Sequence, residues 1–124
     1  MEFKRGTGVT HYFKLPIVDY VVGAFLYFTA KEVVDNDNID ALAVINKQFT
    51  DADVDIITDP LYATYTLKFD PIDFLGLTFP DGASVNNYLG EFKYVVAGTD
   101  PVAFPSANDY IQVKIYANIR VENP

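Results

Sequence analysis

The sequence contains no cysteine and no tryptophan, and it has one histidine among 124 residues. The absence of cysteine excludes disulfide bridges, thiolate zinc sites and cysteine nucleophiles. A catalytic triad would need His11 beside a hydroxyl nucleophile and an orienting carboxylate, but His11 lies in an ordinary alternating stretch, which favours a structural or surface role. The GxSxG, HExxH, phosphate-binding-loop and dinucleotide-binding patterns are all absent. We therefore predict no catalytic residue and no cofactor.

Basic residues are scarce, since nine Lys and Arg stand against 17 Asp and Glu and give a net charge of −8. Such a chain is repelled by phosphate, so we expect no nucleic-acid partner. Thirteen of the acidic residues are Asp, which favours turns, and only four are Glu, which favours helices. Long apolar runs are also missing, and the first 16 residues lack the apolar stretch of a signal peptide. We expect no membrane partner and synthesis in the cytoplasm.

What the sequence does have is a large hydrophobic fraction of 50%, with 15% aromatic residues. A chain of this length can bury one core without disulfide bridges or metals. We predict a single domain over residues 1–121 and a short tail over 122–124.

A period of two in hydrophobicity dominates the chain and indicates β-strands. Asp70 before Pro71 is a helix-start signal, which predicts about one helical turn over residues 71–75. Loops are expected at 78–89 and 98–108, and the long last strand could pair edge to edge with a neighbouring copy. About seven strands with turn residues between them predict an all-β fold, an antiparallel β-sandwich. The expected strands are 7–15, 24–31, 43–49, 54–57, 61–69, 90–97 and 110–122.

The acidic run DNDNID at residues 35–40 could be interpreted as a calcium site. Asp35 and Asp37 match the first two ligand positions of an EF-hand loop, but Asp40 stands where that loop requires glycine. A looser site that also uses Asp55 or Asp59 stays open. The run is also typical of a solvated turn whose Asp and Asn side chains bond their own backbone. We favour the turn and keep Asp35, Asp37 and Asp40 as weak metal candidates.

The segment 24–50, AFLYFTAKEVVDNDNIDALAVINKQFT, is predicted to be a strand, an acidic turn and a second strand. It resembles a recurring segment of Ig-like domains in bacteriophage tail and baseplate proteins. The nearest parallel is the N-terminal domain of baseplate upper proteins of phages that infect Gram-positive bacteria. The segments 4–16, 59–71 and 90–94 are similar to that family's other strands, in the same order. The resemblance implies an Ig-like sandwich and a non-enzymatic role in the virion, after synthesis in the host cytoplasm.

We expect a tail or baseplate assembly component whose partners are other virion proteins and copies of itself in a symmetric assembly. A head-decoration, neck or fibre module is the alternative within the phage. An alternative of another class is a cell-surface carbohydrate-binding module, in which exposed Tyr62, Tyr110 or Tyr116 would stack on sugars. Aromatic residues are enriched at the centres of interfaces, which makes several of them candidate contacts. The interface candidates are Phe74, Phe79, Tyr88, Phe104, Tyr110 and Tyr116.

Overall fold

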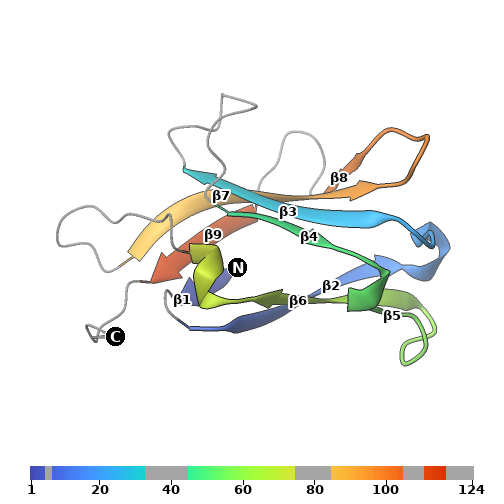
Figure 1. The fold of residues 1–124 in the computed structure, drawn as a ribbon, viewed down its shortest axis with the longest axis horizontal. Helices are drawn as coiled ribbons and strands as arrows, with labels where there is room; N and C mark the ends of the chain where they lie inside the picture. Colours follow the sequence, from blue (N-terminus) through green and yellow to red (C-terminus); the bar gives the residue numbers. More distant parts are fainter. Residues whose placement is uncertain (5–6, 33–44, 75–84, 105–110, 117–124) are drawn as a thin grey trace.

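A computed structural model of the chain describes residues 1–4, 7–32, 45–74, 85–104 and 111–116, which form two β-sheets that face each other (Figure 1). The predicted all-β sandwich and the short helical turn are both confirmed. The strands are β1 (Glu2–Lys4), β2 (Val9–Pro16), β3 (Phe25–Glu32), β4 (Ile45–Phe49), β5 (Val54–Asp55), β6 (Tyr62–Phe69), β7 (Val85–Val95), β8 (Val102–Phe104) and β9 (Ile111–Tyr116). The 3-10 helices of the described residues are η1 (Ile17–Asp19), η3 (Asp51–Asp53) and η4 (Pro71–Phe74).

The larger sheet has the strand order β1-β9-β7-β3-β4, and the smaller sheet has the order β2-β6-β5. β7 is long enough to pair with β3 along one edge and with two strands along the other. Its first half pairs with β9, and its second half pairs with β8. Among the described strands only β1 and β9 pair in parallel, so the prediction of an antiparallel sheet holds for every other ladder.

The core lies between the sheets and is rich in aromatic rings. Four of them, Phe3, Phe28, Phe69 and Phe74, form what we call the phenylalanine cluster. The Phe69 ring centroid lies 4.8 Å from that of Phe3, 5.6 Å from that of Phe28 and 6.5 Å from that of Phe74. Their separations and mostly tilted or edge-on geometry are those that aromatic pairs prefer. The alternation predicted for strands 24–31 and 61–69 places Phe28 and Phe69 on inward-facing positions, as the structure shows.

Gly90 occupies the inward-facing position of β7 that lies against this cluster. A Cβ atom at Gly90 would lie 2.8 Å from Cγ2 of Val113 and 3.1 Å from Cε1 of Phe28. Real Cβ atoms do not approach side chains that closely without displacing them. Glycine at this position therefore lets β3, β7 and β9 share one tightly packed inner face.

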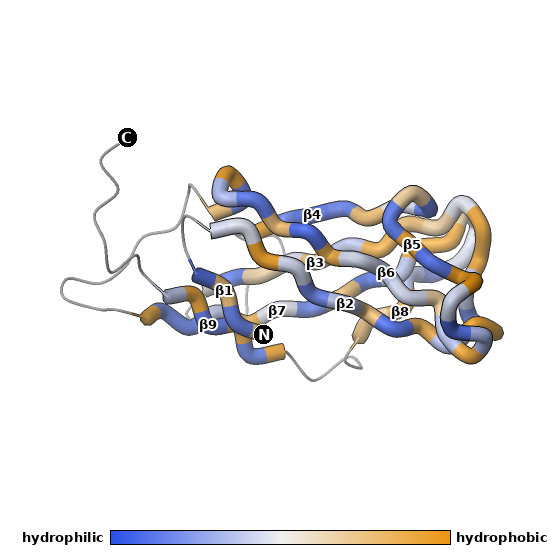
Figure 2. The backbone as a smooth tube through the Cα atoms, turned by 90° about the horizontal axis from the view of Figure 1, so that it is seen from below, coloured by the Kyte–Doolittle hydropathy of each residue, from blue (hydrophilic) through white to orange (hydrophobic). Residues whose placement is uncertain are grey.

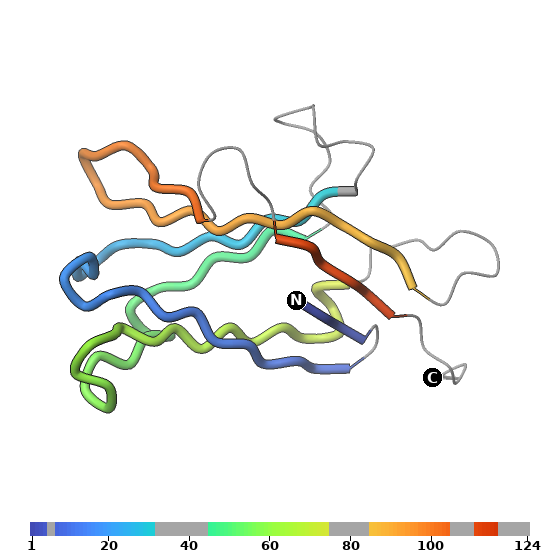
Figure 3. Tube along the Cα trace, turned by 180° about the vertical axis from the view of Figure 1, so that it is seen from behind, coloured from blue at the N-terminus to red at the C-terminus, as the bar shows by residue number. Residues whose placement is uncertain are grey.

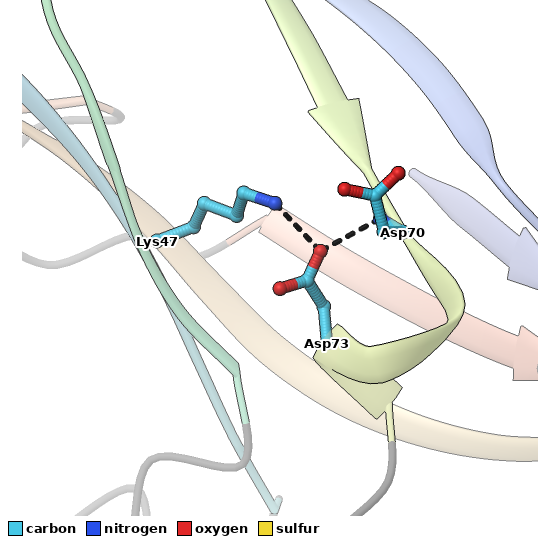
Figure 4. A network of polar contacts seen from close by, with 3 residues as sticks. All are labelled: Lys47, Asp70 and Asp73. Atoms are coloured by element: carbon cyan, nitrogen blue, oxygen red, sulfur yellow. Dashed lines mark hydrogen bonds and ion pairs between the residues drawn. The ribbon is translucent and has the colours of Figure 1, made fainter.

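Helix η4 is held against β4 by a small polar network (Figure 4). Asp70 directly precedes the first residue of η4, as the sequence predicts, and the side chain of Asp73 bonds back to the backbone of Asp70. Oδ2 of Asp73 accepts a hydrogen bond from the backbone N–H of Asp70 at 2.7 Å and contacts Nζ of Lys47 at 2.6 Å. Both charged side chains of this ion pair are largely buried. The network fixes the turn that delivers Phe74 to the core.

Three sequence predictions for the strands are corrected by the structure. β1 and β8 are strands that the sequence did not predict, and β8 lies inside the expected loop 98–108. Residues 85–89 belong to β7 and not to the expected loop 78–89. The Asn86–Asn87 pair suggested a turn, but both residues pair with β9 in the ladder.

The predicted edge-to-edge pairing concerns a last strand over 110–122, of which the structure describes residues 111–116. β1 lies along the edge of β9, with Glu2 beside Lys114 and Lys4 beside Tyr116. The terminal amino group of Met1 donates to the carbonyl of Gln112 at 3.0 Å. The outer edge of β9 is therefore covered by the chain itself over residues 112–116, and this stretch is not free to pair with a neighbour.

Candidate interaction surface

Two of the predicted interface aromatics are buried, and these predictions were wrong. Phe74 is 0% exposed because η4 turns its ring toward Phe3, with 5.3 Å between the ring centroids. Tyr88 is 1% exposed because it occupies an inward-facing position of β7. Both side chains belong to the core, so neither is available to a partner in this structure.

The other predicted residues have mixed outcomes. Phe104 lies in β8 and not in a loop; it is partly buried, with its ring 5.5 Å from that of Phe13. Tyr116 is partly exposed, and its hydroxyl donates to Oε1 of Glu2 at 2.7 Å. This hydrogen bond raises the pKa of Tyr116 above its ordinary value. The remaining candidates fall outside the described residues: Phe79, Tyr110, Asp35, Asp37 and Asp40.

Within the described part of the chain, no group of three or more His, Asp and Glu side chains is placed to hold a metal ion. No helix of that part is long and apolar enough to cross a membrane. The single histidine packs against β1. Nε2 of His11 lies 3.0 Å from the carbonyl of Glu2, and its ring packs edge-on against Phe3 with 5.0 Å between the ring centroids. His11 therefore helps to hold β1 against β2.

A surface that the sequence analysis missed lies at one end of the sandwich. It is built by the segments 17–24, 50–61 and 96–101, which we call the loop end; these loops lie at the same end in Figures 1 and 3. Six of the twelve exposed large hydrophobic residues in the described chain belong to it. Four side chains, which we call the apolar tips, are the most exposed of these: Val18 (87%), Ile57 (87%), Val22 (78%) and Leu61 (68%).

The loop 17–24 is fixed from the core side by Tyr20, Tyr94 and Asp51, which we call the tyrosine–aspartate network. Asp51 accepts a hydrogen bond from the Tyr20 hydroxyl at 2.8 Å and another from the backbone N–H of Gly23 at 2.7 Å. Partial burial and the bond to Asp51 raise the pKa of Tyr20 to about 12. Gly23 has a φ of 85°, a left-handed conformation that favours glycine. The network thus ties the loop 17–24 to η3.

Tyr94 makes the second attachment of the same loop. Its hydroxyl accepts from the backbone N–H of Val21 at 2.7 Å and donates to the carbonyl of Val21 at 3.3 Å. Tyr65 is fully buried beside it, and its hydroxyl has no well-formed hydrogen bond to any described residue. Burial raises the pKa of Tyr65 well above its ordinary value. Hydrogen bonds on the core side therefore hold the backbone between Val18 and Val22, while both valine side chains point toward solvent.

The second loop is fixed by its own aspartates. Asp55 accepts from the backbone N–H groups of Ile57 at 2.9 Å and Thr58 at 3.1 Å, and from the Thr58 hydroxyl at 2.5 Å. These bonds lower the pKa of Asp55. Asp59 accepts from the N–H of Leu61 at 3.0 Å, and the carbonyl of Leu61 accepts from the N–H of Ile17 at 2.9 Å. The two loops are thus joined by a backbone hydrogen bond, and their tips are held in place.

All charged side chains in the three segments of the loop end are negative. These segments contain no Lys, Arg or His. Figure 2 shows hydrophilic and hydrophobic stretches side by side in the loops at this end. The exposed aliphatic side chains of this surface are therefore surrounded by acidic residues. The acidic residues are Asp19, Asp51, Asp53, Asp55, Asp59 and Asp100.

Sequence reasoning searched for exposed aromatic residues and therefore passed over these aliphatic ones. A signal was present in the fragments VDYVVG and DIITDPL, where adjacent Val or Ile residues stand among Asp, Gly and Pro. Two neighbouring aliphatic residues in a strand point to opposite faces, and in a turn both can be exposed. Such pairs between turn residues are the pattern that could have located the surface.

The chain matches none of the protein-family models, curated proteins or solved structures with which it was compared. The interpretation of the loop end therefore depends on its own geometry and chemistry.

Proposed function

We propose that this chain is a non-enzymatic virion structural protein that packs against other proteins in the phage tail or baseplate. The observation that carries the proposal is the loop end, where four aliphatic side chains are exposed on loops that internal hydrogen bonds hold fixed. The similarity of residues 24–50 to Ig-like domains of phage tail proteins supports the virion setting. The Ig-like form of the sandwich belongs to the same proposal.

The energetics suit a packing role. Burying an exposed Val, Leu or Ile side chain contributes about 1.5–3 kcal/mol. Association costs about 4–15 kcal/mol in lost translational and rotational freedom, and further ordering of loops adds to that cost. Because the loop end is already held by the tyrosine–aspartate network and by Asp55 and Asp59, little further ordering is needed on binding. Repeated copies in a symmetric assembly would add avidity to each modest contact.

The test is the composition of purified phage particles from the strain that carries the gene. We expect mass spectrometry to find the chain at a fixed ratio to the tail proteins. Size-exclusion chromatography with light scattering would show whether the purified chain also forms a defined ring. Absence of the chain from particles would contradict the proposal. Neighbouring tail genes would support a tail position, and neighbouring capsid genes would favour the head-decoration, neck or fibre alternative.

A carbohydrate-binding module is the second candidate. It is favoured by Tyr12 and Tyr62, which are both exposed on the outer face of the smaller sheet. Against it, Nζ of Lys14 lies 5.9 Å from the Tyr62 ring centroid and competes for that ring face. Reproducible glycan-array binding that is abolished by Tyr62→Ala or Tyr116→Ala would favour this candidate over the virion proposal.

A further inference from the structure

The loop end has a composition that restricts what can bind it. We infer that it docks onto a partner protein whose surface offers an apolar pocket surrounded by Lys and Arg side chains. The inference deepens the proposed packing function and rests on it.

The first step is the charge around the apolar tips. Several carboxylates of the loop end accept hydrogen bonds from the loops themselves, as Asp51 does from Gly23 and Asp55 does from Thr58. Such bonds favour the ionised form of a carboxylate, and for Asp55 they lower the pKa. Nζ of Lys14 in the adjoining β2 lies 4.0 Å from Oδ2 of Asp59 and offsets one of the six carboxylates, so the loop end keeps a negative charge. A complementary partner must present positive charge around the contact.

The same charge argues against three other occupants. A second copy of this chain cannot use its own loop end in a two-fold contact, because that symmetry would bring two acidic surfaces together. An anionic membrane is disfavoured for the same reason, although exposed aliphatic side chains would otherwise suit it. Nucleic acid is repelled by the carboxylates. The contact is therefore between this chain and a different protein surface.

The second step is the shape of the contact. Val18 and Ile57 are each 87% exposed, so almost nothing in the described chain packs against their sides. Side chains that protrude this far lose most of their water only inside a concave partner site, where interface anchors are usually found. The backbone bond between Ile17 and Leu61 keeps the two loops together. The four apolar tips would therefore enter the partner's pocket together, and the aspartates would contact the Lys and Arg side chains around it.

The experiment measures binding of two synthetic helical-hairpin peptides with the same leucine-lined groove between their helices, one with lysine and one with glutamate at every charged position beside the groove. Titrations of isotope-labelled chain are followed by NMR. The test variant is Val18→Thr/Val22→Thr/Ile57→Thr/Leu61→Thr, which removes the apolar tips and leaves the charge unchanged. The matched control is Ile72→Thr, since Ile72 is 70% exposed but lies in η4, beyond the opposite end of β6. Urea unfolding verifies that both variants keep the fold.

We expect the lysine peptide to shift resonances of residues 17–24 and 56–61. Its affinity should fall at least about tenfold in the four-site variant, stay unchanged in Ile72→Thr, and weaken as salt rises, since exposed charges are screened. The glutamate peptide should not bind. Equal binding of the lysine peptide to the four-site variant would overturn the inference, as would equal binding of the glutamate peptide. Vesicles of phosphatidylcholine and phosphatidylglycerol that bind through the tips would replace the protein partner with a membrane.

The two proposals can fail separately. If particles contain the chain and incorporate the four-site variant as well as the wild type, the docking inference fails and the proposed function stands. If particles lack the chain but the lysine peptide binds through the tips, the virion role fails and the preference for a basic apolar surface stands.

Discussion

The two ends of the core are filled in different ways. At the end beneath η4, the phenylalanine cluster packs four rings with centroid distances of 4.8–6.5 Å and no hydrogen bond among the rings. At the loop end, Tyr94 of β7 accepts a hydrogen bond from the loop backbone at Val21, and Tyr20 of the same loop donates one to Asp51. The hydrophobic effect that buries the rings has no direction, whereas a hydrogen bond fixes the positions of two atoms. The first end therefore stabilises the domain, and the second end positions loops.

Removing one ring from the phenylalanine cluster is the strongest test of this comparison. Phe69→Ala should lower the free energy of unfolding by about 3–5 kcal/mol, because it removes a fully buried ring that contacts several others. Urea denaturation measures the loss. Ile72→Ala, at an exposed position nearby in the sequence, should change stability by less than about 0.5 kcal/mol. A loss below about 1 kcal/mol for Phe69→Ala would mean that this end does not dominate stability.

Overfilling the same cluster should have the next largest effect. Gly90→Ala places a methyl group 2.8 Å from Cγ2 of Val113, so we expect a loss of about 1–3 kcal/mol. Adding Val113→Ala should recover part of it by clearing the space. Gly8→Ala is the matched control, because its Cβ would lie an ordinary 3.7 Å from the carbonyl of Phe69. If Gly90→Ala is as stable as Gly8→Ala, the cluster is less tightly packed than the structure indicates.

At the other end, removing one hydroxyl should loosen a loop more than it unfolds the domain. Tyr94→Phe removes both bonds to Val21, and we expect a loss of about 1 kcal/mol. Hydrogen exchange at the Val21 amide should accelerate, whereas exchange at Leu26 in β3 should change only in proportion to global stability. Equal acceleration at both amides would show that the network supports the whole domain and not the loop alone.

The smallest expected effect is a change in pH dependence. The folded-state pKa of Tyr20 is about 12, above its ordinary value of 10.0, so the folded state favours the neutral hydroxyl. Its contribution to stability is fully present below pH 10 and is lost as the pH rises from 10 through 12. Tyr20→Phe should lose less stability over this interval, measured by urea unfolding at successive pH values. Tyr12→Phe, at an exposed position that holds no loop, should behave as the wild type does.

The parts of the fold that sequence predicts are those with long alternation. Strands that contain Phe28, Phe69 and Val113 were recognised because burial on one face repeats every second residue. β1 was missed because three residues are too few to show a period, and its partner Lys114 lies far along the chain. Asn86 was assigned to a loop because its type favours turns, whereas pairing with Ile115 decides its conformation.

The candidate surface was harder to predict than the fold. Phe74 and Tyr88 were chosen for their residue type, but burial depends on where η4 and β7 direct them, which local sequence does not reveal. Val18 and Ile57 are exposed for a reason that is equally non-local, since Tyr94 and Asp55 anchor the backbone beneath them. The residues of an interaction surface follow from the loops' attachments more than from their own hydrophobicity.

The parallel pairing of β1 with β9 has a consequence for how the protein is made. Glu2 is synthesised before the other described strands, but its ladder partner Lys114 is among the last described residues to be synthesised. Until then Phe3 has no completed groove to enter, and the edge of the larger sheet cannot close. Contacts this distant in sequence form late, because chain closure is entropically costly. Completion of the larger sheet is thus delayed until β9 has emerged, and a nascent chain stalled before residue 111 should remain sensitive to protease at β1.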